Sequence, residues 1–298
     1  MFEEGQLYAP VTTAADGAVT VHLDEGHPGF GDPEYRRRRN HIAARALGWD
    51  PTQPIPHVDY TEEEGEVWRT VCRELAVKHE RLACAEYRTA MAELALPTDH
   101  IPQLDEVGDR LSPLTGFRYH PAAGLVAFDE FYGSLADGIF HSTQYIRHHA
   151  RPLYTPEPDL IHEVIGHGGT LASPRLAELN RLAGRAARRL ETPAARGFFA
   201  RVFWFTIEFG VLYEHGELRA YGAGLLSSYG EIEEFRSAEI RPLRIAEMGV
   251  LAYDITQYQP VLFAADGIEH LLDVVGEFFA ECDDDTPAKL EKAAAARA

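Results

Sequence analysis

Apolar residues recur at helical spacing through most of the chain, most clearly after residue 60. One helical face would carry Val67, Trp68, Val71, Cys72 and Leu75. A capping box precedes this face, because Thr61 can accept from the Glu64 amide while the Glu64 side chain reaches back. The pattern predicts one helix from Thr61 to about Leu96, where Pro97 ends it.

The rest of the pattern is also helical. Strand-like alternation is scarce, with candidates at residues 218–224 and near Leu125. Residues 1–30 are rich in Gly and Pro and predict an irregular N-terminal arm, and residues 281–298 form an acidic, Ala-rich tail with a short helix opening at Thr286. The sequence thus predicts a mostly α protein with a few short β-strands and a single main domain at 31–280.

Composition narrows the classes of partner. The chain is 45% hydrophobic, and its 28 basic and 47 acidic residues give a net charge of −19, which disfavours nucleic acid and acidic membrane surfaces. No apolar run is long enough to span a membrane, and no secretory signal is visible, so we expect a cytoplasmic protein. Cys72, Cys84 and Cys282 lack the spacing of a disulfide framework or a thiolate metal site. The basic run at 36–39 is interpreted as a solvated helix whose arginines pair with acids.

The most informative segment contains two histidines between apolar residues. His162 and His167 are five residues apart, which does not match the HExxH zinc motif and places them about 140° apart on an ideal helix. Both can reach one ion only if the helix distorts, and Gly166, Gly168 and Gly169 make a distortion plausible. The alternative is a pair of buried or surface histidines with no metal role.

Glu208 is the only acid in the apolar, aromatic run 198–211. A buried carboxylate must be paired, neutral or bound to a cation. A salt bridge to Arg201, two turns back, is one solution. A metal site with His162 and His167 is the other, either as the facial two-histidine, one-carboxylate arrangement of Fe(II) oxygenases or as a zinc site.

Several long motifs resemble the pterin-dependent aromatic amino acid hydroxylases. They are TPEPDLIHEVIGH (155–167), HSTQYIRHH (141–149), FWFTIEFG (203–210) and YGAGLLSSYGE (221–231). Shorter ones extend the resemblance from about residue 30 to about residue 260, in unbroken order. The resemblance implies a hydroxylase-type catalytic domain that binds Fe(II) and a tetrahydropterin, uses O₂ as co-substrate, and is a monomer or weak dimer.

The resemblance also implies roles for individual residues. Fe(II) would be held by His162, His167 and Glu208, with Glu163 and Trp204 taking part in catalysis. The pterin would contact Gly124, Val126, Phe131, Glu163, Ala200 and Phe203. The amino acid would contact Arg147, Thr155, Pro158, Asp159, Trp204, Phe209, Gly224 and Ser227. In this interpretation the fork of Arg147 grips the substrate carboxylate and Asp159 orients it, although the two residues could equally be a structural ion pair.

Two positions depart from the family pattern. Gly168, Gly169 and Thr170 replace the usual apolar residue, proline and leucine after the second histidine, and Phe203 replaces a tyrosine on the pterin side. We expect phenylalanine as the substrate, hydroxylated to para- or meta-tyrosine, with tryptophan or tyrosine as alternatives. A zinc hydrolase with Glu163 as general base, or a non-catalytic pterin-binding protein, is the alternative from another class.

Overall fold

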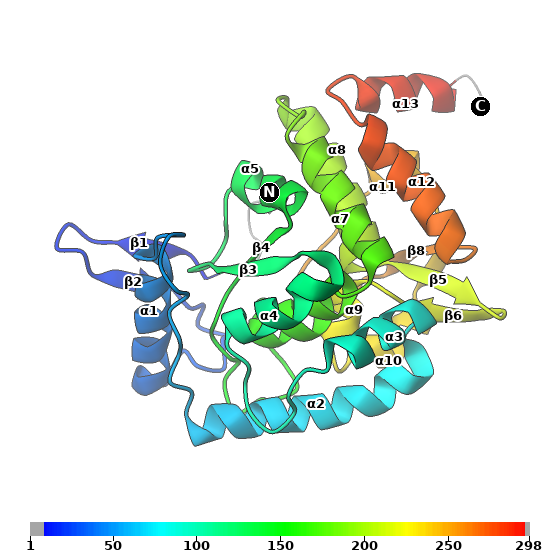
Figure 1. Ribbon diagram of the computed structural model, residues 1–298. Coiled ribbons are helices and arrows are strands. Elements are labelled where there is room, and N and C mark those ends of the chain that lie inside the picture. The colour runs from blue at the N-terminus through cyan, green and yellow to red at the C-terminus, as the bar shows by residue number, and fades with distance from the viewer. Residues whose placement is uncertain (1–8, 296–298) are drawn as a thin grey trace.

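The computed structural model of the protein describes residues 9–295, and helices dominate it, as the sequence predicts (Figure 1). The α-helices are α1 (Pro33–Leu47), α2 (Glu62–Leu82), α3 (Ala85–Leu94), α4 (Leu104–Thr115), α5 (Phe128–Ser134), α6 (Gly169–Leu171), α7 (Pro174–Ala187), α8 (Pro193–Phe203), α9 (Ala223–Ser227), α10 (Glu231–Glu234), α11 (Ile245–Met248), α12 (Ile268–Glu281) and α13 (Thr286–Ala295). Within residues 9–295, none of these helices combines the length and apolar character that a membrane crossing requires.

Other helical geometries join them. Short 3₁₀ helices span Leu135–Asp137 and Phe235–Ser237, and π-helices span His162–Gly168 and Trp204–Glu208. We call the two π-helices the first turn and the second turn. Both contain residues predicted to bind metal, so the distortion expected near His167 is present and the second segment shares it.

The strands are short and form small sheets. Their bounds are β1 (Val11–Thr13), β2 (Val19–Val21), β3 (Arg118–Pro121), β4 (Ile139–Ser142), β5 (Val211–Glu214), β6 (Glu217–Ala220), β7 (Glu239–Pro242) and β8 (Val261–Ala265). β3 and β4 pair in parallel, and the four-stranded sheet has the order β6-β5-β8-β7, with β5 and β6 antiparallel and β8 parallel to β5 and β7. The strand predicted at 218–224 overlaps β6, whereas the prediction near Leu125 is wrong, because Leu125 lies in the exposed loop after β3.

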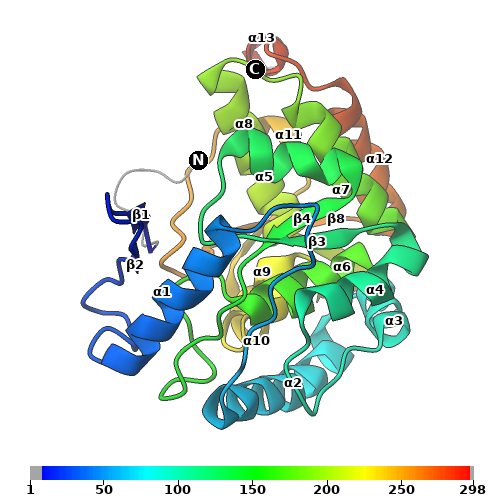
Figure 2. The same ribbon diagram turned by 60° about the vertical axis from the view of Figure 1, so that its left-hand side comes forward.

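The helices surround the first turn from several sides. It packs against α9, α4 and α6, while α7 packs along α12 on the other side of the molecule (Figures 1 and 2). Gly166 allows the close approach of α9, since a Cβ atom there would lie 2.6 Å from the Ala223 carbonyl oxygen. The candidate metal residues are therefore at the centre of the fold.

The long helix predicted from Thr61 starts as expected. Thr61 Oγ1 accepts from the Glu64 amide at 3.2 Å, and the Thr61 amide donates to Glu64 Oε2 at 2.7 Å, so the capping box is confirmed. The predicted apolar face is buried at Val67, Trp68, Val71 and Leu75, and half-buried at Cys72.

The same prediction is wrong about the length of the helix. α2 ends at Leu82 and α3 begins at Ala85, because the Cys84 amide donates to the Ala220 carbonyl at 2.9 Å and Ala83 forms a parallel bridge with Ala220. Cys84 then takes an extended conformation and caps α3. A contact with β6, far along the chain, thus breaks a locally favourable helix.

The two ends of the chain compare differently with expectation. The N-terminal arm is not wholly irregular, because β1 and β2 form an antiparallel hairpin in its described part. Its apolar residues Val21 and Leu23 pack against Tyr35 of α1, which explains why the pairing is retained. In the tail, helix α13 is present from Thr286 and contacts α8 and α11.

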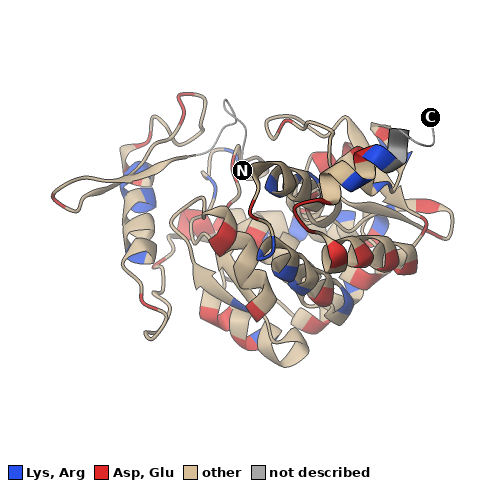
Figure 3. Cartoon of the chain, turned by 90° about the horizontal axis from the view of Figure 1, so that it is seen from above, with Lys and Arg blue, Asp and Glu red and all other residues tan. Residues whose placement is uncertain are grey.

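The basic run lies on α1, where it forms bands of positive charge among the acids of the surface (Figure 3). Arg37 pairs with Glu34 one turn back, as predicted. Arg38 pairs with Glu64 at 2.6 Å, also as predicted. Arg39 corrects the prediction of a solvated face, because it is only 4% exposed and points into the protein.

Candidate active site

The first turn aligns the two histidines. In a π-helix the hydrogen bonds join residues five apart, so side chains at that spacing lie one above the other. His162 and His167 accordingly face each other, with 3.1 Å between their Nε2 atoms. The five-residue spacing that conflicts with an ideal α-helix is the spacing that this geometry requires.

The second turn brings a carboxylate to the same point. The Phe209 amide donates to the Trp204 carbonyl at 2.8 Å, which is a hydrogen bond between residues five apart, as in a π-helix. Glu208 Oε1 lies 3.1 Å from His167 Nε2, and Oε2 lies 3.7 Å from His162 Nε2. Burial opposes ionisation of Glu208, but the two imidazoles outweigh it and lower its pKa. The groups that lower the pKa of Glu208 are these imidazoles, and Arg201 is not among them.

The imidazole of His162 has a fixed orientation. Burial, together with His167, lowers the pKa of His162 to about 4, so the ring is neutral. Its Nδ1 lies 2.8 Å from Ser227 Oγ, and the Ser227 hydroxyl itself donates to the Ala223 carbonyl at 2.8 Å. Nδ1 therefore carries the proton, and the Nε2 lone pair points at Glu208 and His167. Ser227, which is predicted to contact substrate, is thus also placed to orient a candidate metal ligand.

A second carboxyl group lies beside the histidines. A ligand atom of Glu163 and those of His162 and His167 all lie within 4.8 Å of one another. Burial raises the pKa of Glu163 well above its usual range, and the charges of Glu208 and Asp159 add to this effect. The pKa values of the two neighbouring carboxyl groups are therefore shifted in opposite directions, that of Glu208 down and that of Glu163 up.

Arg147 and Asp159 form a buried, bidentate ion pair. Arg147 Nε donates to Asp159 Oδ2 at 2.9 Å and Nη2 donates to Oδ1 at 2.8 Å, and both side chains are at most 3% exposed. Asp159 also accepts from the Arg147 amide and, at 3.3 Å, from the amide of His162. The pair is thus attached to the first turn, and the Nη1 side of the guanidinium faces away from Asp159.

The loop before Asp159 is held by its own contacts and by α1. The Thr155 hydroxyl donates to the Glu157 carbonyl at 2.8 Å, and the Tyr145 hydroxyl donates to the carbonyl of Pro158. Arg39 pairs with Glu157 at 2.6 Å and lies 3.4 Å from the centroid of the Tyr145 ring. This contact explains why Arg39 is buried. Thr155 and Pro158 therefore shape the backbone that leads to Asp159.

Aromatic rings form a wall beside the second turn. Trp204 stacks on Tyr253 with ring centroids 4.2 Å apart and planes 10° apart, and it packs on Phe209 at 4.4 Å. Its indole N–H donates to Gln259 Oε1 at 3.0 Å. Gly224 leaves room for this wall, because a Cβ atom there would lie 2.6 Å from the Phe209 ring. Trp204, Phe209 and Gly224, all predicted to contact substrate, thus lie together.

Comparison with known sequences assigns the chain to a family. The sequence model of the biopterin-dependent aromatic amino acid hydroxylases matches residues 14–292. The chain belongs to this family. Phenylalanine 3-hydroxylase of Streptomyces coeruleorubidus is 50% identical over 264 residues, covering 89% of this chain and 95% of that protein. Human phenylalanine-4-hydroxylase is 39% identical over 266 residues, covering 87% of this chain and 59% of that protein.

Solved structures agree with this assignment. The phenylalanine hydroxylase of Colwellia psychrerythraea matches with a TM-score of 0.72 and 31% identity, covering 79% of this chain and 91% of that one. The Chromobacterium violaceum enzyme, solved with iron(III) and 7,8-dihydrobiopterin, matches with a TM-score of 0.72 and 25% identity over 80% and 90% of the two chains. The chain spans about half the length of the animal relatives that it matches.

The residues that the resemblance assigns to the pterin are distributed in two groups in this hydroxylase. Phe131 and Phe203 both pack on Tyr132, with centroids 5.0 and 4.9 Å apart, and Ala200 is buried one turn before Phe203. Gly124 lies instead against the arm, where a Cβ atom would be 3.1 Å from Val11. Val126 is half-buried in the loop between these groups.

Several residues of the site were missed by sequence reasoning. They are Tyr87, Tyr119, Tyr132, Tyr253 and Gln259. Tyr253 and Gln259 follow the last motif of the family resemblance, so no local pattern marked them. Tyr132 directly follows the predicted pterin residue Phe131, and this adjacency is the one signal in the sequence that could have identified it.

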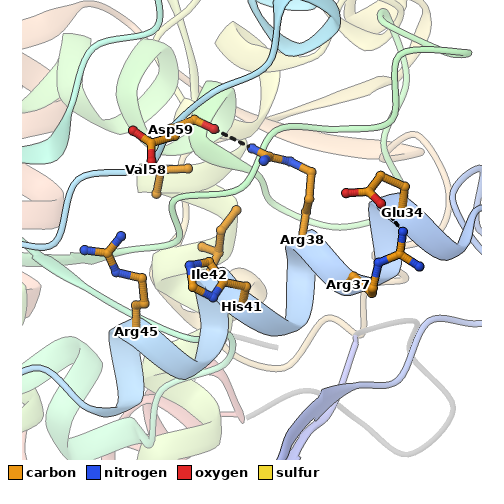
Figure 4. A pocket seen from close by; sticks show the side chains of 8 residues that line it. All are labelled: Glu34, Arg37, Arg38, His41, Ile42, Arg45, Val58 and Asp59. Carbon is orange, nitrogen blue, oxygen red and sulfur yellow. Dashed lines mark hydrogen bonds and ion pairs between the residues drawn. The ribbon is translucent and has the colours of Figure 1, made fainter.

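A separate hollow lies along the exposed side of α1 (Figure 4). Its arginines already have partners in the protein: Arg37 contacts Glu34, Arg38 donates to the Asp59 carbonyl at 2.9 Å, and Arg45 donates to a loop carbonyl. The hollow includes neither His162 and His167 nor the aromatic wall. The two π-helices therefore remain the candidate active site.

Proposed function

We propose that the protein hydroxylates the ring of free phenylalanine at the 3 position, using iron, a tetrahydropterin and O₂. The convergence of the His162, His167 and Glu208 ligand atoms on one point carries this proposal. The choice of phenylalanine and of the 3 position is supported by the relative of that name, which is 50% identical and is covered over 95% of its length.

The three side chains fit an iron ion. Ligand atoms about 2.1 Å from a metal lie about 3.0 Å apart when they subtend right angles and about 3.4 Å apart in a tetrahedron. The separations here are 3.1, 3.1 and 3.7 Å. Two neutral imidazoles and one carboxylate on one face match the facial triad of Fe(II) oxygenases, which leaves the opposite positions open. Iron and the tetrahydropterin would together activate O₂ for transfer of one oxygen atom to the ring.

Arg147 would bind the substrate carboxylate. Asp159 occupies one edge of its guanidinium and fixes the plane of the group. The Nη1 side can then donate to a second carboxylate, and burial makes such a charge-assisted bond strong. Because Asp159 also contacts the amide of His162, the amino acid would be positioned relative to the metal ligands.

Trp204 and Phe209 would hold the substrate ring and exclude water from the reacting atoms. On the other side, Phe131 would stack on the pterin, with Gly124 and Val126 offering backbone groups. Glu163, Ala200 and Phe203 would complete the pterin site. The hydroxyl absent at Phe203 has a neighbour that can replace it, since the Tyr132 ring packs on Phe203.

We also propose that the chain works in the cytoplasm as a monomer or weak dimer. The described cysteines are free, as is common in a reducing compartment. Helix α13 packs back on α8 and α11 of its own chain, so its surface is partly used within the monomer.

The decisive experiment supplies purified protein with Fe(II), a tetrahydropterin, O₂ and phenylalanine, tyrosine or tryptophan in turn, and separates the product isomers. We expect meta-tyrosine from phenylalanine. Para-tyrosine as the main product would contradict the 3 position, and turnover confined to tyrosine or tryptophan would contradict the substrate. Failure to oxygenate any of the three would contradict the proposed activity.

The same protein tests the zinc-hydrolase alternative, which membership of the hydroxylase family already disfavours. Samples loaded with Zn(II) should turn over neither esters nor peptides. Hydrolysis by the zinc form without O₂ uptake would support that alternative.

A further inference from the structure

Tyr119 of β3 reaches the backbone of the first turn. Its hydroxyl donates to the Glu163 carbonyl at 2.8 Å, and the side chain is 1% exposed. Glu163 follows His162 directly, so this hydrogen bond holds the turn close to its first histidine. The bond comes from a strand that contributes none of the residues predicted from the family resemblance.

Gly168 provides the space for this contact. A Cβ atom at Gly168 would lie 2.9 Å from the Tyr119 hydroxyl oxygen. The backbone of Gly168 has φ −57° and ψ −42°, which any residue adopts in a helix. The backbone conformation of Gly168 would therefore accept any residue, and it is the nearby Tyr119 hydroxyl that favours glycine at this position. This accounts for one of the two glycines that replace the usual family residues after His167.

A second path joins Tyr119 to His167. Tyr119 pairs with Phe140 across β3 and β4, and their rings meet edge to face with centroids 5.6 Å apart. The Phe140 ring in turn packs on the His167 imidazole at 4.5 Å. Tyr119 thus bonds to the backbone directly after His162, has its hydroxyl over Gly168 directly after His167, and reaches the His167 ring through one intervening ring.

We propose that Tyr119 is a positioning residue for the metal site, and that Gly168 is the matching gap that lets its hydroxyl reach the first turn. The inference rests on the proposed metal role of His162 and His167. Residues around metal ligands typically change metal affinity by 10–100-fold when they are altered. A ring that only filled the core would not need the hydroxyl.

The test compares Tyr119→Phe, Gly168→Ala and the double variant by titrating the apo-proteins with Co(II) and recording the visible absorption of the bound ion. Tyr119→Phe should weaken Co(II) binding about tenfold and shift the absorption bands. Gly168→Ala should weaken it further, because the added methyl displaces the hydroxyl. The double variant should bind better than Gly168→Ala alone, since removal of the hydroxyl makes room for the methyl.

Tyr60→Phe is the matched control, because the Tyr60 hydroxyl also donates to a backbone carbonyl at 2.8 Å, away from the first turn. It should lower the melting temperature of the apo-protein about as much as Tyr119→Phe and leave Co(II) binding unchanged. Wild-type affinity and spectrum in Tyr119→Phe would overturn the positioning role alone. A wild-type protein that binds no Co(II) would overturn the proposed metal site and this inference with it.

Discussion

The two π-helical turns bring the candidate metal ligands to the same point but are supported differently. The first turn relies on side chains from distant parts of the chain. The Tyr87 hydroxyl donates to the Ile165 carbonyl at 2.9 Å, and Ser227 accepts from His162. Glycines in this turn let neighbouring helices approach, so its position is set from outside.

The second turn is supported largely by its own helix. The Thr206 hydroxyl donates to the Val202 carbonyl at 2.6 Å, and the Phe209 amide closes the widened turn. Its outward contacts are made mainly by aromatic rings: Trp204 stacks on Tyr253 and donates to Gln259, and Phe205 packs on Phe263. The same helical geometry is therefore reached by external support in one case and by local hydrogen bonds in the other. The first turn should be sensitive to substitutions far along the sequence, and the second turn to substitutions within it.

The proposed anchor for the substrate carboxylate is connected to the first turn, because Asp159 accepts from the amide of His162. Arg147→Lys tests this anchor and has the largest expected effect. An ammonium cannot reproduce two parallel hydrogen bonds, so KM for the amino acid should rise about 10- to 100-fold, equivalent to about 1.5–3 kcal/mol. Iron content should stay the same. Steady-state kinetics and metal analysis on one preparation provide the measurement.

An ion pair with a purely structural role gives a different result for the same variant. Arg147→Lys would then lower the melting temperature and leave KM unchanged in the protein that remains folded. Phenethylamine, which lacks the carboxylate, should be a poor substrate for the wild type if Arg147 binds that group. Efficient turnover of phenethylamine would contradict the assignment.

Removing one hydroxyl from beneath each turn compares their supports directly. Tyr87→Phe should lower the unfolding free energy by about 1–2 kcal/mol, because a buried bond to the first turn is lost. Thr206→Val should change it by less than about 0.5 kcal/mol, since a hydroxyl that bonds back within its own helix contributes little. Urea unfolding of the apo-proteins measures both. A larger loss in Thr206→Val would reverse the comparison.

Two buried titratable groups, His79 and Glu231, should contribute to folding stability with opposite dependence on pH. Burial lowers the pKa of His79, which donates to the Leu226 carbonyl in α9, to about 4. Between pH 6.5 and 4 the unfolded chain binds a proton at His79 that the folded chain does not, so the contribution of His79 to stability falls as pH falls.

Burial raises the pKa of Glu231, which accepts from the Gln259 amide, to about 7. Between pH 4.5 and 7 the folded chain keeps a proton that the unfolded chain loses, so this contribution falls as pH rises.

Neutral replacements isolate each contribution. His79→Gln should flatten the loss of apo-protein stability between pH 6.5 and 4. Glu231→Gln keeps an acceptor for the Gln259 amide and should flatten the loss between pH 4.5 and 7. Unfolding free energies measured across pH 4–8 give both slopes. Slopes equal to those of the wild type in either variant would show that the group does not titrate differently on folding.

The sequence predicts those features of the molecule that depend on the residue types and on their spacing along the chain. The capping box at Thr61 follows from residue spacing, and the choice of His162, His167 and Glu208 as candidate metal ligands follows from the cost of burying polar groups. The family resemblance supplies the roles of the site residues. Long-range contacts explain what the sequence does not predict. Ala220 breaks the helix at Cys84 from a distant strand, and Glu157 draws Arg39 inward from the loop before Asp159. The hydroxyls that support the first turn are equally remote in sequence.

The central claim is that the two turns together hold one iron ion through His162, His167 and Glu208. Glu208→Gln keeps the shape of the side chain and removes its charge, and Glu217→Gln, at an exposed position of β6, is the matched control. After anaerobic loading with Fe(II) and removal of excess metal, the wild type and the control should retain iron in equal, stoichiometric amounts. Glu208→Gln should retain little, with the melting temperature of its apo-protein close to that of the wild type. Equal iron content and near-normal hydroxylation in Glu208→Gln would remove this carboxylate from the metal site and contradict the account.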